Sequence, residues 1–421
     1  MSKKNELLKN ISWIMIGNIV HAVFQFLLNI YLCRKISTDL NGLLNYAISL
    51  ISFFSCICAL GFNGIITIKF SEDSDNAGEY ICTAIMARVF VGMISIIILQ
   101  IIIWPQNDKL LSLITLCQSL SLLFSPIDMF IYWLRYDMKA KNAAIFRLQA
   151  FFVSMAVRVV SLAVYNSLIG YIMGTVFETF LYGVFLYKFY ICNSYPQLKF
   201  SWIALRNMLK RSYPFVFSAL MVTIYGHTDK LMLKSMISNT AVANYSVSAT
   251  IVSLLSVVAS ALIEGMRSSV MQQKMKNEEA YKKQIKRLYS SVFWLCIAYG
   301  LFITIFSKQM LIVLYGNKYI NASPVLVVLV WYSAFSYFGS INNMHLVAGG
   351  KEKLIPIKTG IGTVLNVFLN LTFIPHFGAV GAAIASLMTQ IFTNFIINFL
   401  IPELKDINSL IIEAILLKDV L

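Results

Sequence analysis

Long apolar stretches alternate with short polar breaks along the whole chain. A helix needs about 20 apolar residues to cross a bilayer, so this pattern predicts twelve membrane-spanning helices. We expect them at residues 10–33, 43–68, 80–104, 109–133, 143–165, 167–190, 212–233, 241–267, 288–307, 324–348, 354–374 and 377–401. No long polar segment is left over for a soluble domain.

The composition agrees with an integral membrane protein. Of the 421 residues, 58% are hydrophobic and only 13% are charged, whereas soluble domains are about 25% charged. A net charge of +15 would point to nucleic acid in a soluble protein. In a chain this apolar we expect the bilayer, and no nucleic acid, as the partner. The predicted fold class is therefore an all-α integral membrane protein.

The positive charges predict an orientation. Of the 34 Lys and Arg residues, 25 fall in loops on the side of the N-terminus and six fall on the opposite side. The remaining three, Arg88, Arg158 and Lys230, lie within predicted spans. Because cytoplasmic loops carry an excess of Lys and Arg, we expect a multi-pass membrane protein with both termini in the cytoplasm.

A weak internal repeat divides the spans into two sets of six. The segment Asn45-Tyr46-Ala-Ile-Ser49 recurs 199 residues later as Asn244-Tyr245-Ser-Val-Ser248, and each copy opens the second span of its set. Parallel repeats of this kind are typical of transporters. We therefore expect an N-terminal six-helix lobe at 1–190, a cytoplasmic linker at 191–211, a C-terminal lobe at 212–401 and a cytoplasmic tail at 402–421.

The linker shows helical periodicity. Leu198, Trp202, Leu205 and Leu209 recur at helical spacing, with Lys and Arg on another face. This pattern predicts an amphipathic helix in the membrane interface, and a plain basic loop is the alternative. The tail allows two interpretations, a second interfacial helix or a frayed end.

Ionisable residues inside the bilayer are the candidates for function, because burying them there is costly. Glu178 and His21 lie near the middle of their predicted spans, Arg158 lies slightly outward of the middle, and Arg88 lies a third of the way in. A structural Arg158–Glu178 pair between neighbouring helices is the alternative for two of them. Asp229-Lys230, by contrast, is expected near the outer end of its span, where interfacial anchoring competes with function.

Amide side chains add polar faces to three spans. They are Asn18, Gln25 and Asn29 on the first span, Asn366 and Asn370 on the eleventh, and Gln390, Asn394 and Asn398 on the twelfth. Within the last two spans the amides are four residues apart, so each set lies on one side of a helix. Such faces either join helices or line a watery cavity.

No catalytic or metal site is predicted. The four histidines lack a carboxylate or cysteine at metal-ligand spacing, and no phosphate-cradling Gly-Lys-Ser/Thr loop exists. We expect no enzyme activity and no cofactor beyond a coupling proton or sodium ion. We also expect a monomer.

Several motifs resemble bacterial polysaccharide-unit flippases, the O-antigen or Wzx-type group. They are Arg34-Lys35 at the end of a span, Asn41-Gly42-Leu-Leu-Asn45-Tyr46-Ala, Leu60-Gly61, Asp229-Lys230-Leu-Met-Leu before Asn244-Tyr245, Leu314-Tyr315-Gly316-Asn317-Lys318-Tyr319, and Pro375-His-Phe-Gly378-Ala-Val-Gly381. Each motif is degenerate, but their order and spacing match the group over nearly the whole chain. The resemblance implies membership of the superfamily that also contains multidrug exporters and peptidoglycan-precursor flippases.

The resemblance also implies a fold and a substrate. The fold is two six-helix bundles that form a V-shaped transporter around a central cavity and work by alternating access. The substrate is an oligosaccharide linked to undecaprenyl diphosphate, with glycan-assembly proteins as candidate partners in O-antigen and lipopolysaccharide synthesis.

Roles for the intramembrane residues follow as hypotheses. Arg88, Arg158 and Lys230 would bind the diphosphate, because a buried anion needs cations. Glu178 or His21 would titrate and couple transport to an ion gradient. Asn18, Gln25, Asn29, Asn366 and Asn370 would line the polar cavity.

Two other functions compete. One is a drug or metabolite exporter of the same fold, against which a cationic cavity argues where the drug is a cation. The other is a membrane glycan polymerase or glycosyltransferase, which would be expected to need a larger outside loop than any in this chain.

Overall fold

The predicted all-α fold is confirmed. The computed structural model describes residues 3–193 and 195–416, and within them the chain is helical with no β-strand. Ten helical stretches are long and apolar enough to cross a membrane. The last of them, Leu354–Leu400, contains two of the predicted spans. The predicted span 212–233 lies within a helix that is not among the ten, and His227, Asp229 and Lys230 lower its hydropathy.

The helices form two compact units. The first comprises Met1–Ser37 and Tyr46–His227, and the second comprises Thr38–Asn45 and Thr228–Leu421. One division falls inside α2, after Asn45, and another falls inside the continuous helix α10, after His227. The separate linker predicted at 191–211 is continuous with α10 from Trp202 onward.

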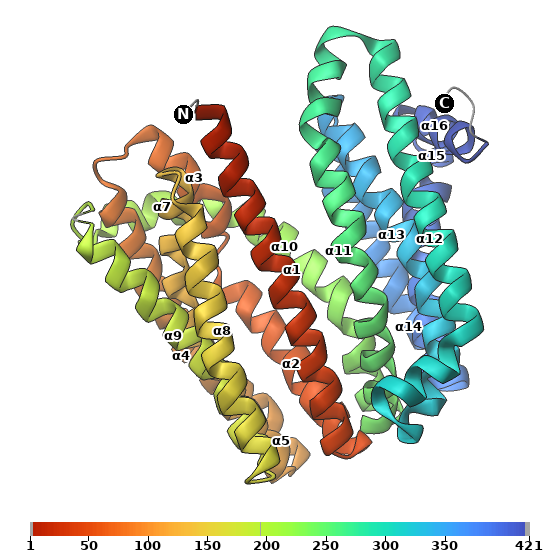
Figure 1. The fold of residues 1–421 in the computed structure, drawn as a ribbon, viewed down its shortest axis with the longest axis horizontal. Helices are drawn as coiled ribbons and strands as arrows, with labels where there is room; N and C mark the ends of the chain where they lie inside the picture. Colours follow the sequence, from red (N-terminus) through yellow and green to blue (C-terminus); the bar gives the residue numbers. More distant parts are fainter. Residues whose placement is uncertain (1–2, 194, 417–421) are drawn as a thin grey trace. The chain divides into compact units, whose positions relative to one another are not determined.

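The first unit is built from α1 to α9 and most of α10. In Figure 1, α8 lies beside α9 and α1 packs along α8. The helices are α1 (Lys3–Lys35), α2 (Thr38–Cys58), α3 (Phe62–Glu72), α4 (Ala77–Ile103), α5 (Lys109–Ser119), α6 (Ser121–Phe124), α7 (Met129–Tyr136), α8 (Ala140–Ala163), α9 (Leu168–Cys192) and α10 (Trp202–Met236).

The second unit contains the remaining helices. Figure 1 shows α11 and α12 running side by side as a long hairpin, and α13 packs against both. The helices are α11 (Asn239–Lys276), α12 (Glu278–Tyr315), α13 (Ser323–Ala348), α14 (Leu354–Ile391), α15 (Ile397–Leu400) and α16 (Lys405–Ile415).

The fourth predicted span is broken inside the first unit. Helix α5 ends at Ser119, α6 is a single short turn, and a 3-10 turn over Ser125–Asp128 leads into α7. Pro126 sits in that turn, and a proline has no backbone N–H to continue the helical hydrogen-bond ladder. The break exposes backbone groups that a continuous helix would satisfy.

The eleventh and twelfth predicted spans form a helical hairpin. Gly378 interrupts α14 with φ 55° and ψ −132°, a conformation open to glycine. After this turn the two arms come very close together, because a Cβ on Gly381 would lie 2.2 Å from the carbonyl oxygen of Phe373. The single long helix therefore provides two antiparallel segments.

The linker packs onto the first unit. Residues 195–201 are not helical, and the backbone N–H of Ser201 donates to Oγ1 of Thr83 at 3.1 Å. Helix α10 then buries Ala204 and Met208, whereas Trp202 and Leu209 are exposed. The predicted apolar face is thus only half correct, since its Leu198 and Leu205 pack inward and the other two do not.

The predicted tail is a docked helix. Its inward-facing residues Ile407, Leu410, Ile411 and Ala414 are buried in the core of the second unit. Lys286 Nζ lies 2.5 Å from Oε2 of Glu413, and His345 Nε2 lies 3.1 Å from Oδ2 of Asp406. A frayed end is therefore wrong for residues 402–416, and an interfacial position of this helix stays a prediction. The last five residues lie outside the described part of the chain.

Candidate functional site

Five polar side chains meet inside the first unit, and we call them the Arg158 network. Arg158 forms an ion pair with Glu178, and its guanidinium also donates to Oε1 of Gln25 at 3.2 Å and to Oγ of Ser154 at 3.1 Å. Ser154 Oγ donates to Glu178 Oε2 at 3.2 Å. His21 Nε2 lies 3.3 Å from Oε1 of the same carboxylate. Four of these residues, His21, Gln25, Arg158 and Glu178, were predicted site residues.

Helical spacing brings this network together. His21 and Gln25 are four residues apart on α1, and Ser154 and Arg158 are four residues apart on α8, so each pair shares one face of its helix. Glu178 faces them from α9. In the sequence, the position of His21, Arg158 and Glu178 deep within their predicted spans marks them as candidates. The i, i+4 spacing then brings Gln25 beside His21 and Ser154 beside Arg158.

A glycine makes room for the arginine. A Cβ on Gly174 would lie 2.6 Å from Cγ of Arg158, so α9 offers a flat surface at this position. The guanidinium also lies 5.8 Å from the ring centre of Tyr171 and 5.9 Å from that of Phe151, within cation–π range. The arginine is therefore held by charge, hydrogen bonds and aromatic faces together.

Within the Arg158 network, the arginine is more deeply buried than Glu178 and His21. The Arg158 side chain is 2% exposed, whereas the side chains of Glu178 and His21 are each 18% exposed. A group reaching the network therefore meets the carboxylate and the imidazole before the guanidinium. Because Glu178 neutralises Arg158, the predicted structural pair is present.

Arg88 forms a second ion pair. Its Nη1 donates to Oδ1 of Asp128 at 2.7 Å, and this carboxylate comes from the 3-10 turn of the broken span. Arg88 is 4% exposed, whereas the Asp128 side chain is 34% exposed. Asp128 thus provides the carboxylate that pairs with an arginine of α4.

The other amides predicted on the first span lie apart from the network. Asn18 is exposed and accepts from Nη1 of Arg147 at 3.3 Å. Asn29 accepts a weak hydrogen bond from the thiol of Cys33. Of the three amides on that face, Gln25 is the one that contacts Arg158.

A different buried acid lies in the second unit. Asp229 accepts hydrogen bonds from Nδ2 of Asn370 at 2.6 Å, from Oγ of Ser386 at 2.6 Å and from the hydroxyl of Tyr245. Asn366 joins through its Oδ1, which accepts from Nδ2 of Asn370 at 3.1 Å. Interfacial anchoring is therefore wrong for Asp229, which is 4% exposed, because Gly378 folds both arms of α14 around it.

The other predicted site residues of the second unit lie in or next to the Asp229 cluster. Asn366 and Asn370 are 1% and 0% exposed. Asn370 donates to Asp229 and to Asn366, and Asn366 donates to Oγ of Ser386 at 3.5 Å. Lys230 is half-buried and follows Asp229 along α10. Among the described residues, no three His, Cys, Asp or Glu side chains come together as a metal site.

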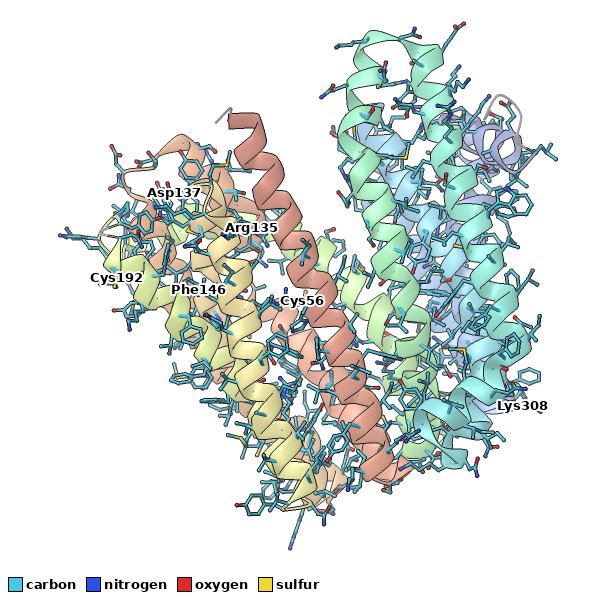
Figure 2. The ribbon with its side chains drawn as sticks, in the orientation of Figure 1. Cys56, Arg135, Asp137, Phe146, Cys192 and Lys308 are labelled. Atoms are coloured by element: carbon cyan, nitrogen blue, oxygen red, sulfur yellow. The ribbon has the colours of Figure 1, made fainter. Side chains whose placement is uncertain are left out.

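A polar cluster fastens the segment before α10 to the loop after α7. Lys139 Nζ donates to the hydroxyl of Tyr195 at 2.6 Å and lies 3.0 Å from Oδ2 of Asp137. Figure 2 marks Asp137 beside Arg135 at this end of the unit. The hydrogen bond to Tyr195 raises the pKa of Lys139, and burial raises the pKa of Tyr195. At neutral pH the lysine is therefore charged and the phenol is neutral.

Comparison with solved structures identifies the fold. The chain superimposes on the lipid II flippase MurJ in an inward closed conformation with a TM-score of 0.76, at 13% identity, over 96% of this chain and 90% of that one. An inward-facing multidrug resistance transporter of the MATE family matches with a TM-score of 0.69, at 15% identity, over 93% of this chain and 95% of that one. The chain therefore has the fold of these two-lobed membrane transporters.

Relatives by sequence are membrane proteins of archaea. The chain is 23% identical over 386 residues to a protein of Haloferax volcanii named a probable low-salt glycan biosynthesis flippase, covering 89% of this chain and 79% of that protein. It is 24% identical over 265 residues to an uncharacterized membrane protein of Methanocaldococcus jannaschii. That match covers 61% of this chain and about half, 51%, of the relative.

Residues 7–266, more than half of the chain, match the family described as polysaccharide biosynthesis protein. This match confirms the predicted resemblance to polysaccharide flippases at the level of the family. The prediction of a multi-pass membrane protein is also confirmed. The chain belongs to the polysaccharide biosynthesis protein family.

Proposed function

We propose that this protein is a flippase that carries an oligosaccharide linked to undecaprenyl diphosphate from the cytoplasmic to the outer leaflet. It would work by alternating access in a bacterial cytoplasmic membrane, with both termini inside. Family membership and the transporter fold support a membrane flippase or exporter. The substrate and the coupling ion are the parts that we infer.

The observation that carries this proposal is the Arg158 network. Arg158 pairs with the Glu178 carboxylate through Nη2, and a guanidinium is also suited to phosphate oxygens. In the resting protein Glu178 occupies that partner position. A diphosphate that reaches the network would replace the carboxylate as the partner of Arg158.

This exchange gives Glu178 a coupling role. Protonation removes the negative charge of the carboxylate and so weakens its hold on Arg158. A proton taken up at Glu178 would therefore favour diphosphate binding at Arg158, and release of the diphosphate would favour loss of the proton. His21, 3.3 Å from Glu178, is placed to pass the proton to the carboxylate.

The other predicted cations take secondary roles. Arg88 is paired with Asp128, so the same exchange of carboxylate for phosphate would apply there. Lys230 lies in the second unit next to Asp229. Both would assist the substrate at another stage of the cycle.

A cell assay with matched variants tests the assignment. Cells that make the glycan but lack their own copy of this gene are complemented with Arg158→Lys, Glu178→Gln or the control Arg147→Lys. Arg147 lies on the same helix as Arg158 and is partnered by an exposed amide. We expect surface glycan to be lost with Arg158→Lys, because a lysine cannot make the forked contact. Glu178→Gln should abolish the dependence on an ion gradient.

The result is interpreted only against protein amount in the membrane. Normal surface glycan with Arg158→Lys at normal protein amount would contradict the diphosphate role. Unchanged gradient dependence with Glu178→Gln would remove Glu178 from coupling. Full glycan export in cells without the protein, together with new drug sensitivity, would favour the drug exporter instead.

A further inference from the structure

A polar pocket lies in the first unit, and neither Arg88 nor Arg158 is among its lining residues. Its volume is about 270 Å³, and it lies between α2, the broken α5–α7 span and α10. Five hydroxyls line it, from Ser52, Ser55, Ser121, Ser125 and Thr223. Ser52 and Ser55 lie near the middle of the membrane-spanning stretch Thr38–Glu72, and Ser121 and Ser125 lie near the middle of Lys109–Tyr136, so the pocket is at membrane depth.

No Lys, Arg, Asp or Glu lines this pocket. The remaining polar groups are the amide of Gln118 and the imidazole of His227, and Ile48, Ile51 and Leu122 complete the wall. Burying a charged ligand here would cost several kcal/mol because no counter-charge faces it. A neutral group rich in hydrogen-bonding atoms has no such penalty.

The hydroxyls are arranged as acceptors. Ser52 donates to the carbonyl of Ile48, and Ser121 to that of Gln118, each at 2.8 Å. Thr223 donates in the same way along α10 at 2.8 Å. The hydrogens of these three hydroxyls are thereby used within the chain's own helices, and their oxygen lone pairs remain to accept a bond from a ligand.

Gln118 supplies the complementary donor. Its Oε1 accepts from Oγ1 of Thr175 at 3.0 Å, which fixes the amide and leaves its NH₂ group as a donor. The pocket thus combines acceptors and a donor with apolar side chains. A sugar ring offers the same mixture, since each of its hydroxyls donates and accepts while its C–H groups are apolar.

The irregular backbone around the pocket is a second indication that the pocket binds a ligand. Ser121 begins the short α6 and Ser125 begins the 3-10 turn, so the pocket sits where the span is broken. Irregular backbone at membrane depth is tolerated where it is buried in protein or lines a water-filled cavity, and broken helices mark substrate sites in transporters. This arrangement would be costly if the pocket served only packing.

We propose that this pocket binds one neutral sugar ring of the transported glycan lipid, as a subsite separate from the Arg158 network. The inference rests on the proposed flippase function and adds to it the chemical class of the sugar that is recognised. The volume is slightly below the roughly 300–1,000 Å³ of pockets for drug-sized ligands. It therefore suits a single ring and leaves the rest of the glycan outside.

The test compares three lipids with wild type and two pocket variants. The lipids are undecaprenyl diphosphate alone, the same lipid with one glucose, and the same lipid with one glucuronic acid. The variants are the double substitution Thr223→Val with Ser121→Ala, which removes two acceptors at nearly constant volume, and Ser55→Leu, which fills space. The control is Ser253→Ala on α11, an exposed serine that also donates to its own helix.

Binding to purified protein and transport in proteoliposomes are both measured. We expect wild type and the control to bind the glucose lipid about tenfold more tightly than the bare lipid, from one or two net hydrogen bonds. The glucuronic acid lipid should gain nothing. Both pocket variants should bind all three lipids with the affinity of the bare lipid.

The outcomes separate this inference from the proposed function. Equal binding of glucose and bare lipid by wild type, or a preference kept in both pocket variants, overturns the sugar subsite while the flippase proposal stands. Failure of wild type to move any of the three lipids overturns the flippase proposal and the subsite with it. If one variant does not fold, the other still decides, because either alone should abolish the preference.

Discussion

Removing the charge of Arg158 leaves the Glu178 carboxylate without its ion-pair partner inside the membrane. Arg158→Met keeps most of the side-chain length and removes the guanidinium. Gln25 and Ser154 lose a hydrogen-bond partner as well. We therefore expect a large loss of stability from this single substitution.

The size of the loss follows from burial. Arg158 is 2% exposed and Glu178 18%, and breaking a buried pair by removing one partner costs about 3–5 kcal/mol. Replacing both partners by apolar residues removes the unpaired charge. The double variant Arg158→Met/Glu178→Met should be within about 1–2 kcal/mol of wild type, since only the neutral hydrogen bonds of the neighbours are lost.

Denaturant unfolding of the purified protein in micelles measures both effects. Arg147→Met, at an exposed position of the same helix α8, serves as the control and should cost at most about 0.5 kcal/mol. A single variant as stable as wild type, or a double variant no more stable than the single, would refute the reasoning. The stable double variant also separates function from structure, because it should fold and yet fail to transport.

Three further predictions concern the second unit. Gly381→Ala should greatly reduce folded protein, because its Cβ would lie 2.2 Å from a backbone oxygen, whereas Gly360→Ala, with open space around it, should be tolerated in the same expression assay. Ile411→Ala should cost about 2–5 kcal/mol in thermal unfolding, because this side chain of α16 is 0% exposed, while its 43%-exposed neighbour Ile412→Ala should cost little. Asp229→Leu should destabilise by about 1–3 kcal/mol for each buried donor left without an acceptor, and unchanged unfolding would contradict its role as a hydrogen-bond centre.

Much of the fold could be predicted from hydropathy alone. Span positions depend on length and apolarity, which the bilayer fixes directly. The positions at which helices break or turn are harder to predict from hydropathy. The conformations at Pro126 and Gly378 depend on local packing. The packing of α16 against the second unit could not be predicted from the sequence either. An amphipathic helix has the same pattern whether its apolar face contacts lipid headgroups or protein.

The part of the candidate site that could be predicted from the sequence consists of ionisable residues deep within apolar spans. Glu178, His21 and Arg158 were identified because an ionisable group is costly in an apolar span. For Asp229 the sequence leaves function and anchoring both open, because its position near the end of a span gives no sign that α14 folds around it. The hydroxyl pocket was missed for a different reason: serine and threonine are common in membrane helices, and only their convergence from three segments distinguishes Ser52 from any other serine.

The central claim is that this protein moves a diphosphate-linked glycan across a bilayer. Its most direct test is the purified protein in proteoliposomes that hold a labelled undecaprenyl diphosphate oligosaccharide in one leaflet, with an ion gradient imposed. The account predicts that wild type transfers the label to the other leaflet faster than empty liposomes do, that dissipating the gradient slows the transfer, and that the folded Arg158→Met/Glu178→Met variant is inactive. Transfer no faster than in empty liposomes, or full activity of that variant, would contradict it.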